Sequence, residues 1–286
     1  MLSCSLFNCK NRYVYPPFKN GLYLEEYFKK YVIENNPPMT RKYIPVTWTN
    51  FQIERGFSYR RTRIKMQNTL NEWVKNNPSE TGYFTVVQHD DGPMLRLPQN
   101  TIVYGACSGN VPIPLVYQDT NNTLTSFPQK TFLEKRTLCS FVGNITSNSV
   151  KPNVREIMFE KFIKNDKFSM INSGGWVVNV NSSLQEVFIN TTIDSKFALA
   201  PRGYGRSSFR FFEIFQLGAI PVYIWNDVNW LPFQDTIDYS RLCVSIHISK
   251  IDELEQILSH IDESQYNNML EYYSEIKHLF TVEGMT

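Results

Sequence analysis

The stretch that most constrains the fold runs from Phe197 to Tyr223 and reads FALAPRGYGRSSFRFFEIFQLGAIPVY. It opens with a short apolar run, passes through a loop with two glycines, and continues into a helical pattern that Gly218 ends. An apolar, β-prone run follows at Ala219–Ile224. A strand, a glycine loop, a helix and a second strand at this spacing predict a βαβ unit. Such units bind ligands where the first strand ends and the helix begins.

The charges in this stretch predict an anion site. Arg202, Arg206 and Arg210 fall in the loop and the first helical turn. The N-terminus of a helix carries a partial positive charge, so each arginine there costs about 0.3–1 kcal/mol. A bound phosphate offsets that cost, because arginine side chains fit its oxygens. Glu213, three residues after Arg210, is placed to accept hydrogen bonds from ribose hydroxyls. The alternative is an exposed loop with an Arg–Glu surface pair.

The segment APRGYGRSSFRFFEIFQLGAIPVYI resembles the signature of the exostosin-like glycosyltransferases, glycosyltransferase family 47. Their pattern is approximately P-R-G-x-G-R-x-S-x-R-x-x-E-x-x-x-x-G-x-I-P-V. The resemblance extends from about Tyr43 to Ile261 and is strongest over 197–233. It implies an α/β protein of the GT-B type, in which two Rossmann-like domains face each other across a cleft. It also implies a nucleotide-sugar donor held mainly by the C-terminal domain, and transfer with inversion at the anomeric carbon.

The resemblance assigns donor-binding roles by position. Arg202, Arg206 and Ser207 would hold the donor diphosphate, Glu213 the ribose, and Gly143 would line the same pocket. Other residues join this expected donor site for physical reasons. Gly203 and Gly205 let the backbone approach the ligand closely, and Arg210 adds charge. Arg155 either reaches phosphate or is solvated.

A second candidate site is the turn His89-Asp90-Asp91-Gly92-Pro93, which follows the expected strand Tyr83–Gln88. It resembles a strand end in many family members. An inverting transferase needs a base for the proton of the acceptor hydroxyl. Asp90 is the first candidate, followed by His89 and Asp91. The alternatives are a turn or helix cap built by Asp90, and a His89 that orients the sugar or the leaving phosphate.

The 286 residues suffice for two domains, which we place at 1–130 and 131–286, with the polar stretch Gln118–Thr131 as linker. A final helix beginning near Tyr266 is expected to cross back onto the first domain, as in many GT-B proteins. Further helices are expected over 21–34 and 59–76, after Asn153, and after Asp252 as cap. Further strands are expected over 43–48, 101–104, 111–116, 137–142, 174–180 and 242–246.

Composition and missing motifs restrict the partners. A net charge of +2 argues against a general nucleic-acid binder. No Asp-x-Asp motif occurs, so we expect no metal and no cofactor beyond the donor. The five scattered cysteines indicate a reducing compartment or at most one disulfide. No apolar run is long enough to span a membrane. We expect a cytoplasmic protein, or one in the Golgi lumen if an anchoring segment has been removed.

The function expected from the resemblance is metal-independent, inverting transfer from a UDP-sugar to a glycan hydroxyl. UDP-xylose is the first candidate, because the chain is similar to exostosin-like xylosyltransferases of large algal viruses and no extra basic cluster awaits an acidic sugar. One alternative is a catalytically inactive glycan-binding or partner subunit. Another is an anion-binding enzyme such as a sulfotransferase, but no GxxxxGK[ST] motif is present.

Overall fold

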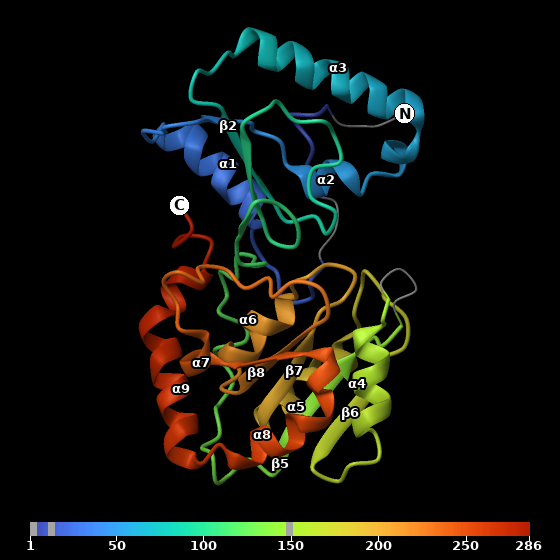
Figure 1. Cartoon of the computed structure of the whole chain (residues 1–286), viewed down its shortest axis with the longest axis vertical. Helices are drawn as coiled ribbons and strands as arrows, with labels where there is room; N and C mark the ends of the chain where they lie inside the picture. The colour runs from blue at the N-terminus through green and yellow to red at the C-terminus, as the bar shows by residue number, and fades with distance from the viewer. Residues whose placement is uncertain (1–4, 11–14, 147–150) are drawn as a thin grey trace.

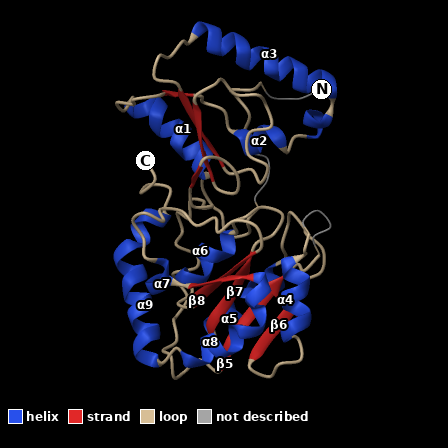
Figure 2. Cartoon of the chain, viewed as in Figure 1, coloured by secondary structure: helices blue, strands red, loops and turns tan. Residues whose placement is uncertain are grey.

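The computed structural model describes residues 5–10, 15–146 and 151–286. Two parallel β-sheets lie one above the other along the long axis of the molecule (Figure 1). Helices cover both sheets, as Figure 2 shows by colour. The chain is therefore a mixed α/β protein with two parallel sheets, as the alternation of helices and strands predicts.

The first sheet has the order β1-β2-β3-β4. Its strands are β1 (Lys42–Tyr43), β2 (Tyr83–Val87), β3 (Thr101–Gly105) and β4 (Val111–Pro112). Both outer strands are shorter than predicted. Proline explains this, because it has no N–H to donate to a neighbouring strand. Ile44 still donates to Phe84, but Pro45 follows it; Ile113 still donates to Gly105, but Pro114 follows it.

Helices and a 3₁₀ turn cover this sheet. They are α1 (Leu24–Asn35), α2 (Trp48–Gln52), η1 (Arg55–Ser58) and α3 (Arg60–Asn76). The predictions over 21–34 and 59–76 are confirmed by α1 and α3. Residues from Trp48 onward were predicted to be the end of a strand and a turn, but they form α2. The indole N–H of buried Trp48 donates to Thr85 of β2 at 2.7 Å, which fastens α2 to the sheet.

The second sheet has the order β6-β5-β7-β8-β9, with all neighbours parallel. Its strands are β5 (Thr137–Gly143), β6 (Phe168–Asn172), β7 (Ser195–Pro201), β8 (Ile220–Trp225) and β9 (Val244–His247). Counted along the chain, this is the order 2-1-3-4-5 of doubly wound sheets. The order reverses between β5 and β7. Ligands of such sheets bind in the crevice beyond the carboxyl ends of the strands at that point.

The predicted βαβ unit is confirmed as β7, α6 (Phe209–Gln216) and β8. Phe197 of β7 pairs with Ile220 of β8 in parallel register. On α6, Phe211 and Phe215 are almost fully buried and belong to the largest hydrophobic core. Gly218 takes a φ of +70°, the left-handed conformation that favours glycine at a helix end. The remaining helical segments are α4 (Val154–Phe162), α5 (Ser182–Ile193), α7 (Tyr239–Leu242), η2 (Ile248–Glu253), α8 (Leu254–His260), α9 (Glu263–Ile276) and η3 (Lys277–Phe280).

Two local predictions in this half are wrong. Residues 174–180 form a loop, and the strand of this region lies earlier, at β6. Gly174 has a φ of +85°, which does not fit a strand. Asp252 does not cap a helix with its side chain; it lies in η2 and forms an ion pair with Lys161. The predicted cap of α4 is confirmed, since the Asn153 side chain accepts from the N–H of Glu156.

The end of the chain differs from the expected crossing helix. α9 packs against β8 and α7 of the second sheet. The segment after it reaches the first half of the chain, where Gln118 donates to Glu283 at 3.2 Å. Cys9 is disulfide-bonded, whereas Cys107, Cys139 and Cys243 are free and buried. Among the described residues, no helix is both long and apolar enough to cross a membrane.

Candidate functional site

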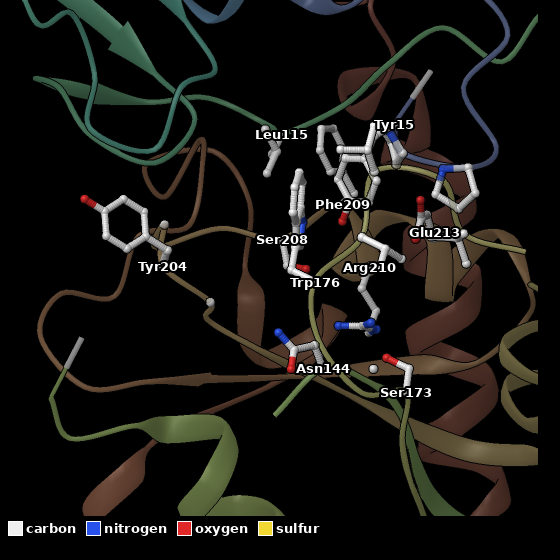
Figure 3. A pocket seen from close by; sticks show the side chains of 18 of the residues that line it. Tyr15, Leu115, Asn144, Ser173, Trp176, Tyr204, Ser208, Phe209, Arg210 and Glu213 are labelled. Carbon is white, nitrogen blue, oxygen red and sulfur yellow. The ribbon is translucent and has the colours of Figure 1, made fainter. Parts of the chain in front are cut away.

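A cavity of about 890 Å³ lies beyond the carboxyl ends of β5 and β7. Its walls come from both sheets: His89 and Asp90 follow β2, while Gly143 ends β5. Its size is that of a typical small-ligand site. It sits where the strand order of the second sheet reverses, as expected for a doubly wound fold. From the motif after β7 it is lined by Gly203, Tyr204, Gly205, Ser207, Ser208, Phe209, Arg210 and Glu213 (Figure 3).

Arg210 brings a poorly compensated charge to this cavity. One guanidinium nitrogen, Nη2, donates to the carbonyl of Val142 at 2.8 Å. Its Nε is buried and has no hydrogen-bond partner. The guanidinium lies over the ring of Phe141, and no carboxylate among the described residues lies within 4.0 Å of it. Burial lowers its pKa, although Glu213 opposes the shift. A half-buried cation in this state is stabilised by an anion.

Arg155 adds a second charge of the same kind. It donates to the carbonyl of Asn144 at 3.0 Å and to that of Arg202 at 3.2 Å, so it bridges the loops after β5 and β7. Burial and the nearby charge of Arg210 lower its pKa to about 10. Within the described part of the chain it has no ion pair. From the sequence, Arg155 either reaches phosphate or is solvated. In the structure its side chain lines the cavity.

Arg202 and Arg206 lie elsewhere. Neither is among the cavity-lining residues, and both pair with Asp227, at 2.5 and 2.8 Å. Burial raises the pKa of Asp227, but hydrogen bonds from Val228 N–H and the two arginines outweigh it and lower the pKa to about 2. Two of the three arginines expected at the anion thus tie the glycine loop to the segment after β8.

Glu213 lines the cavity from α6 and is buried. Its Oε1 accepts a hydrogen bond from the hydroxyl of Tyr117 at 2.7 Å. Burial raises its pKa, and the bond from Tyr117 and the charge of Arg210 only partly offset this. The carboxyl group is held in one orientation at the cavity wall, where it can accept from a ligand hydroxyl. Tyr117 was missed from the sequence because it stands between the predicted strand over 111–116 and the predicted linker, outside any motif.

The three candidate residues of the turn after β2 lie in two different environments. His89 and Asp90 line the cavity, but Asp91 does not. Asp91 accepts from the hydroxyl of Tyr204 at 2.7 Å and so connects the turn to the glycine loop. His89 Nδ1 accepts from the N–H of Asp91, which leaves its proton on Nε2 when the ring is neutral. Burial lowers the pKa of His89, although both aspartates raise it.

Asp90 lines the cavity and is an exposed residue there. Desolvation by the surrounding protein raises its pKa, and the charge of Asp91 adds to the effect. A hydrogen bond from the Cys107 thiol and the charges of His89 and Arg155 act in the opposite direction. A carboxyl group with a raised pKa in a cleft is suited to accept a proton.

Three glycines allow this arrangement by omitting a side chain. A Cβ on Gly143 would lie 2.5 Å from Arg210 Nη2, and one on Gly203 would lie 2.8 Å from Arg155 Nη2. A Cβ on Gly205 would lie 2.1 Å from Asp90 Oδ1 and 2.6 Å from the sulfur of Cys107. Each glycine therefore permits the close approach of one charged group of the cavity.

Substituting Gly205 with alanine is expected to destabilise the protein by about 1–3 kcal/mol, because the added methyl group collides with Asp90 and Cys107. Thermal denaturation measures the change. Gly175→Ala is the matched control, since a Cβ there meets nothing within 4 Å. Equal midpoints for the two variants would show that the turn after β2 moves away at no cost, and that the contact does not fix Asp90.

Glu25 forms hydrogen bonds at the start of the turn after β2. This side chain of α1 is fully buried and accepts hydrogen bonds from the N–H of Gln88 and from the N–H and hydroxyl of Thr49. Burial raises its pKa to about 7 in spite of these bonds. In the unfolded chain the pKa is near 4.5. Between these values the folded state holds a proton that the unfolded state releases, so Glu25 makes the protein less stable as pH rises.

Glu25→Gln removes this titration, so the variant should gain stability relative to the wild type between pH 4.5 and 7. The relative gain is about 3 kcal/mol, at about 1.4 kcal/mol per pKa unit. Denaturation curves at several pH values measure it. Glu34→Gln, an exposed position on the same helix, is the control and should follow the wild type. A constant difference between Glu25→Gln and wild type across this range would contradict a raised pKa.

Two aromatic residues complete the cavity from segments without a recognisable motif. Tyr15 comes from the N-terminal segment and Trp176 from the loop between β6 and α5, and their rings lie 5.5 Å apart. Neither was among the predicted site residues. Trp176 is 63% exposed.

Comparison with known proteins concerns the family of the chain. The profile of the Exostosin GT47 domain matches residues 73–261. "Probable glycosyltransferase At3g07620" of Arabidopsis thaliana is 32% identical over 83 residues, which are 29% of this chain and 17% of the relative. "Probable glycosyltransferase At5g03795" of the same plant is 32% identical over 91 residues, 32% of this chain and 17% of the relative. The matches thus span about a sixth of each plant protein.

Proposed function

The chain belongs to the exostosin GT47 family, and from this premise we propose that it transfers a sugar from a UDP-sugar to a hydroxyl group of a glycan, with inversion at the anomeric carbon. The observation that carries the proposal is the pair Arg155 and Arg210. Both are half-buried, both line the cavity, and neither has a carboxylate partner among the described residues. A diphosphate at the reversal point of the second sheet would supply the missing negative charge.

The residues along the cavity fit a donor laid out in one direction. Arg155 and Arg210 would hold the diphosphate, and Glu213 lies one helical turn beyond Arg210, where a ribose would follow. Gly143, Gly203 and Gly205 leave room at the diphosphate, while Ser207 and Ser208 offer hydroxyl groups. The sugar would then lie toward Asp90, which is in contact distance of the Gly205 backbone.

In this arrangement Asp90 acts as the base. The acceptor oxygen attacks the anomeric carbon from the face opposite UDP, the bond to the phosphate oxygen breaks, and the acceptor proton passes to Asp90. The two arginines neutralise the charge that develops on the leaving diphosphate. We propose that they take the place of a divalent metal, so that turnover requires none. Among the described residues, no group of three or more His, Cys, Asp or Glu side chains is placed to hold a metal ion.

The two parallel sheets correspond in this proposal to the two Rossmann-like domains of a GT-B enzyme, with a boundary near residue 130. Xylose is the first donor sugar to test, followed by galactose and glucuronate. The disulfide of Cys9 favours an oxidising compartment such as the Golgi lumen over the cytoplasm.

The experiment that tests the proposal is incubation of the protein with each UDP-sugar and a panel of glycan acceptors in EDTA. We expect release of UDP with one donor, and NMR should show a product whose anomeric configuration is opposite to that of the donor. Turnover that disappears in EDTA and returns with manganese would overturn metal independence. UDP binding without turnover on any acceptor would instead indicate an inactive partner subunit.

A further inference from the structure

We propose that the hydroxyl group of Tyr15 is a third ligand of the donor diphosphate, carried into the cavity by the N-terminal segment and oriented by Trp176. This inference rests on the proposed function and adds a phosphate-binding group that lies far from the motif. Tyr15 and the motif arginine Arg210 are separated by almost 200 residues in sequence but line the same cavity.

The segment that carries Tyr15 is anchored on the second half of the molecule. Pro16, Pro17 and Phe18 also line the cavity. Phe18 is buried and its ring stacks on that of Phe188 in α5, at 6.0 Å and 30°. Leu124 and Leu217 complete this small core. The anchor fixes the segment across the cavity.

Aromatic contacts then fix the Tyr15 ring. It meets Trp176 edge-on at 5.5 Å and 61°, and Phe209 at 6.3 Å and 76°. In Figure 3 these three rings lie above the guanidinium of Arg210, while Asn144 and Ser173 lie below it. Phe209 is the first residue of α6 and immediately precedes Arg210. The ring of Tyr15 is therefore held at the start of the helix that presents the cation.

The hydroxyl group of Tyr15 is available to a ligand. Among the described residues it forms no hydrogen bond, and it lines the cavity. A tyrosine hydroxyl can donate one hydrogen bond, and an anionic phosphate oxygen in the cavity would be an acceptor for it.

The charges around Tyr15 agree with this role. Burial raises its pKa, and Glu213 raises it further, whereas Arg210 and Arg155 lower it. The hydroxyl group is therefore close to the same charges that would hold the diphosphate, and it remains neutral near pH 7. A neutral donor adds a hydrogen bond to a phosphate without adding to the repulsion between the two arginines.

The test compares Tyr15→Phe with wild type for UDP and for uridine, which lacks phosphate, using ligand-observed NMR and calorimetry. We expect about tenfold weaker binding of UDP, since a hydrogen bond to a charged group is removed, and less than twofold change for uridine. Trp176→Ala removes the ring that contacts Tyr15, and should weaken UDP binding by a smaller factor. Tyr117→Phe, which frees Glu213, should weaken UDP and uridine alike.

Unchanged UDP affinity in Tyr15→Phe would overturn the inference, and so would equal losses for UDP and uridine, since both would give Tyr15 a packing role. Circular dichroism and the thermal midpoint show whether each variant is folded. If the wild-type protein binds neither UDP nor uridine, the proposed function itself fails. The two failures are therefore distinguishable.

Discussion

Replacing Arg210 with methionine is expected to weaken UDP binding by about 10- to 100-fold while leaving the thermal midpoint unchanged or higher. The loss of affinity follows because a charge-assisted hydrogen bond contributes about 1.5–3 kcal/mol. The effect on stability has the opposite sign because the half-buried guanidinium has a buried, unpaired Nε and no carboxylate partner among the described residues. Methionine fills a similar volume without the cost of burying a charge.

Calorimetry with UDP and thermal denaturation measure the two effects. Arg136→Met is the matched control, because Arg136 is exposed and pairs with Asp194 on the surface. We expect it to change neither quantity much, as exposed ion pairs contribute little. If the Arg210→Met variant binds UDP normally, or if its thermal midpoint falls by many degrees, then this arginine stabilises the fold and does not bind the ligand.

Replacing Asp90 with asparagine is expected to lower kcat by about 10²–10⁴-fold, the usual contribution of a general base. Asparagine has nearly the same shape, so the affinity for UDP should change less than threefold. In the wild type, kcat should rise with pH through the pKa of Asp90, which burial raises, because only the carboxylate can accept the proton. The asparagine variant should lose this part of the pH profile.

Asp91→Asn is the control for this experiment. Asp91 lies outside the cavity and accepts from Tyr204, so its replacement should affect kcat far less. Retained turnover in Asp90→Asn together with its loss in His89→Gln would transfer the role of base to His89. Equal effects of the two aspartate variants would show that the turn acts only as a structural connection.

The βαβ unit was predictable because its signals are local. An apolar strand, two glycines, a phenylalanine face and the terminating Gly218 follow one another in the chain, and they produce β7, α6 and β8. The carboxyl group after β2 was predictable for a related reason: strand ends of parallel sheets face one ligand crevice. Several of the predicted site residues line one cavity. They are Asp90, Arg155, Arg210, Glu213, Gly143, Gly203 and Gly205.

The spacing of the three motif arginines does not predict which of them lines the cavity and which form ion pairs elsewhere. Asp227, about two dozen residues after the loop, pairs with Arg202 and Arg206 and leaves Arg210 to the cavity. Such a pairing depends on the return of β8 beside β7, which is a tertiary contact. Tyr15 and Trp176 were missed for the same reason, since isolated aromatic residues in loops carry no periodicity that marks a site.

The most direct test of the account is a calorimetric titration of the wild-type protein with UDP in EDTA, repeated with Arg210→Met. The account predicts saturable binding of about one UDP per chain without a metal, and binding that is weakened at least tenfold in the variant. Absence of UDP binding, or equal binding by both proteins, would contradict the central claim that the two arginines of the cavity, Arg155 and Arg210, hold the diphosphate of a nucleotide sugar.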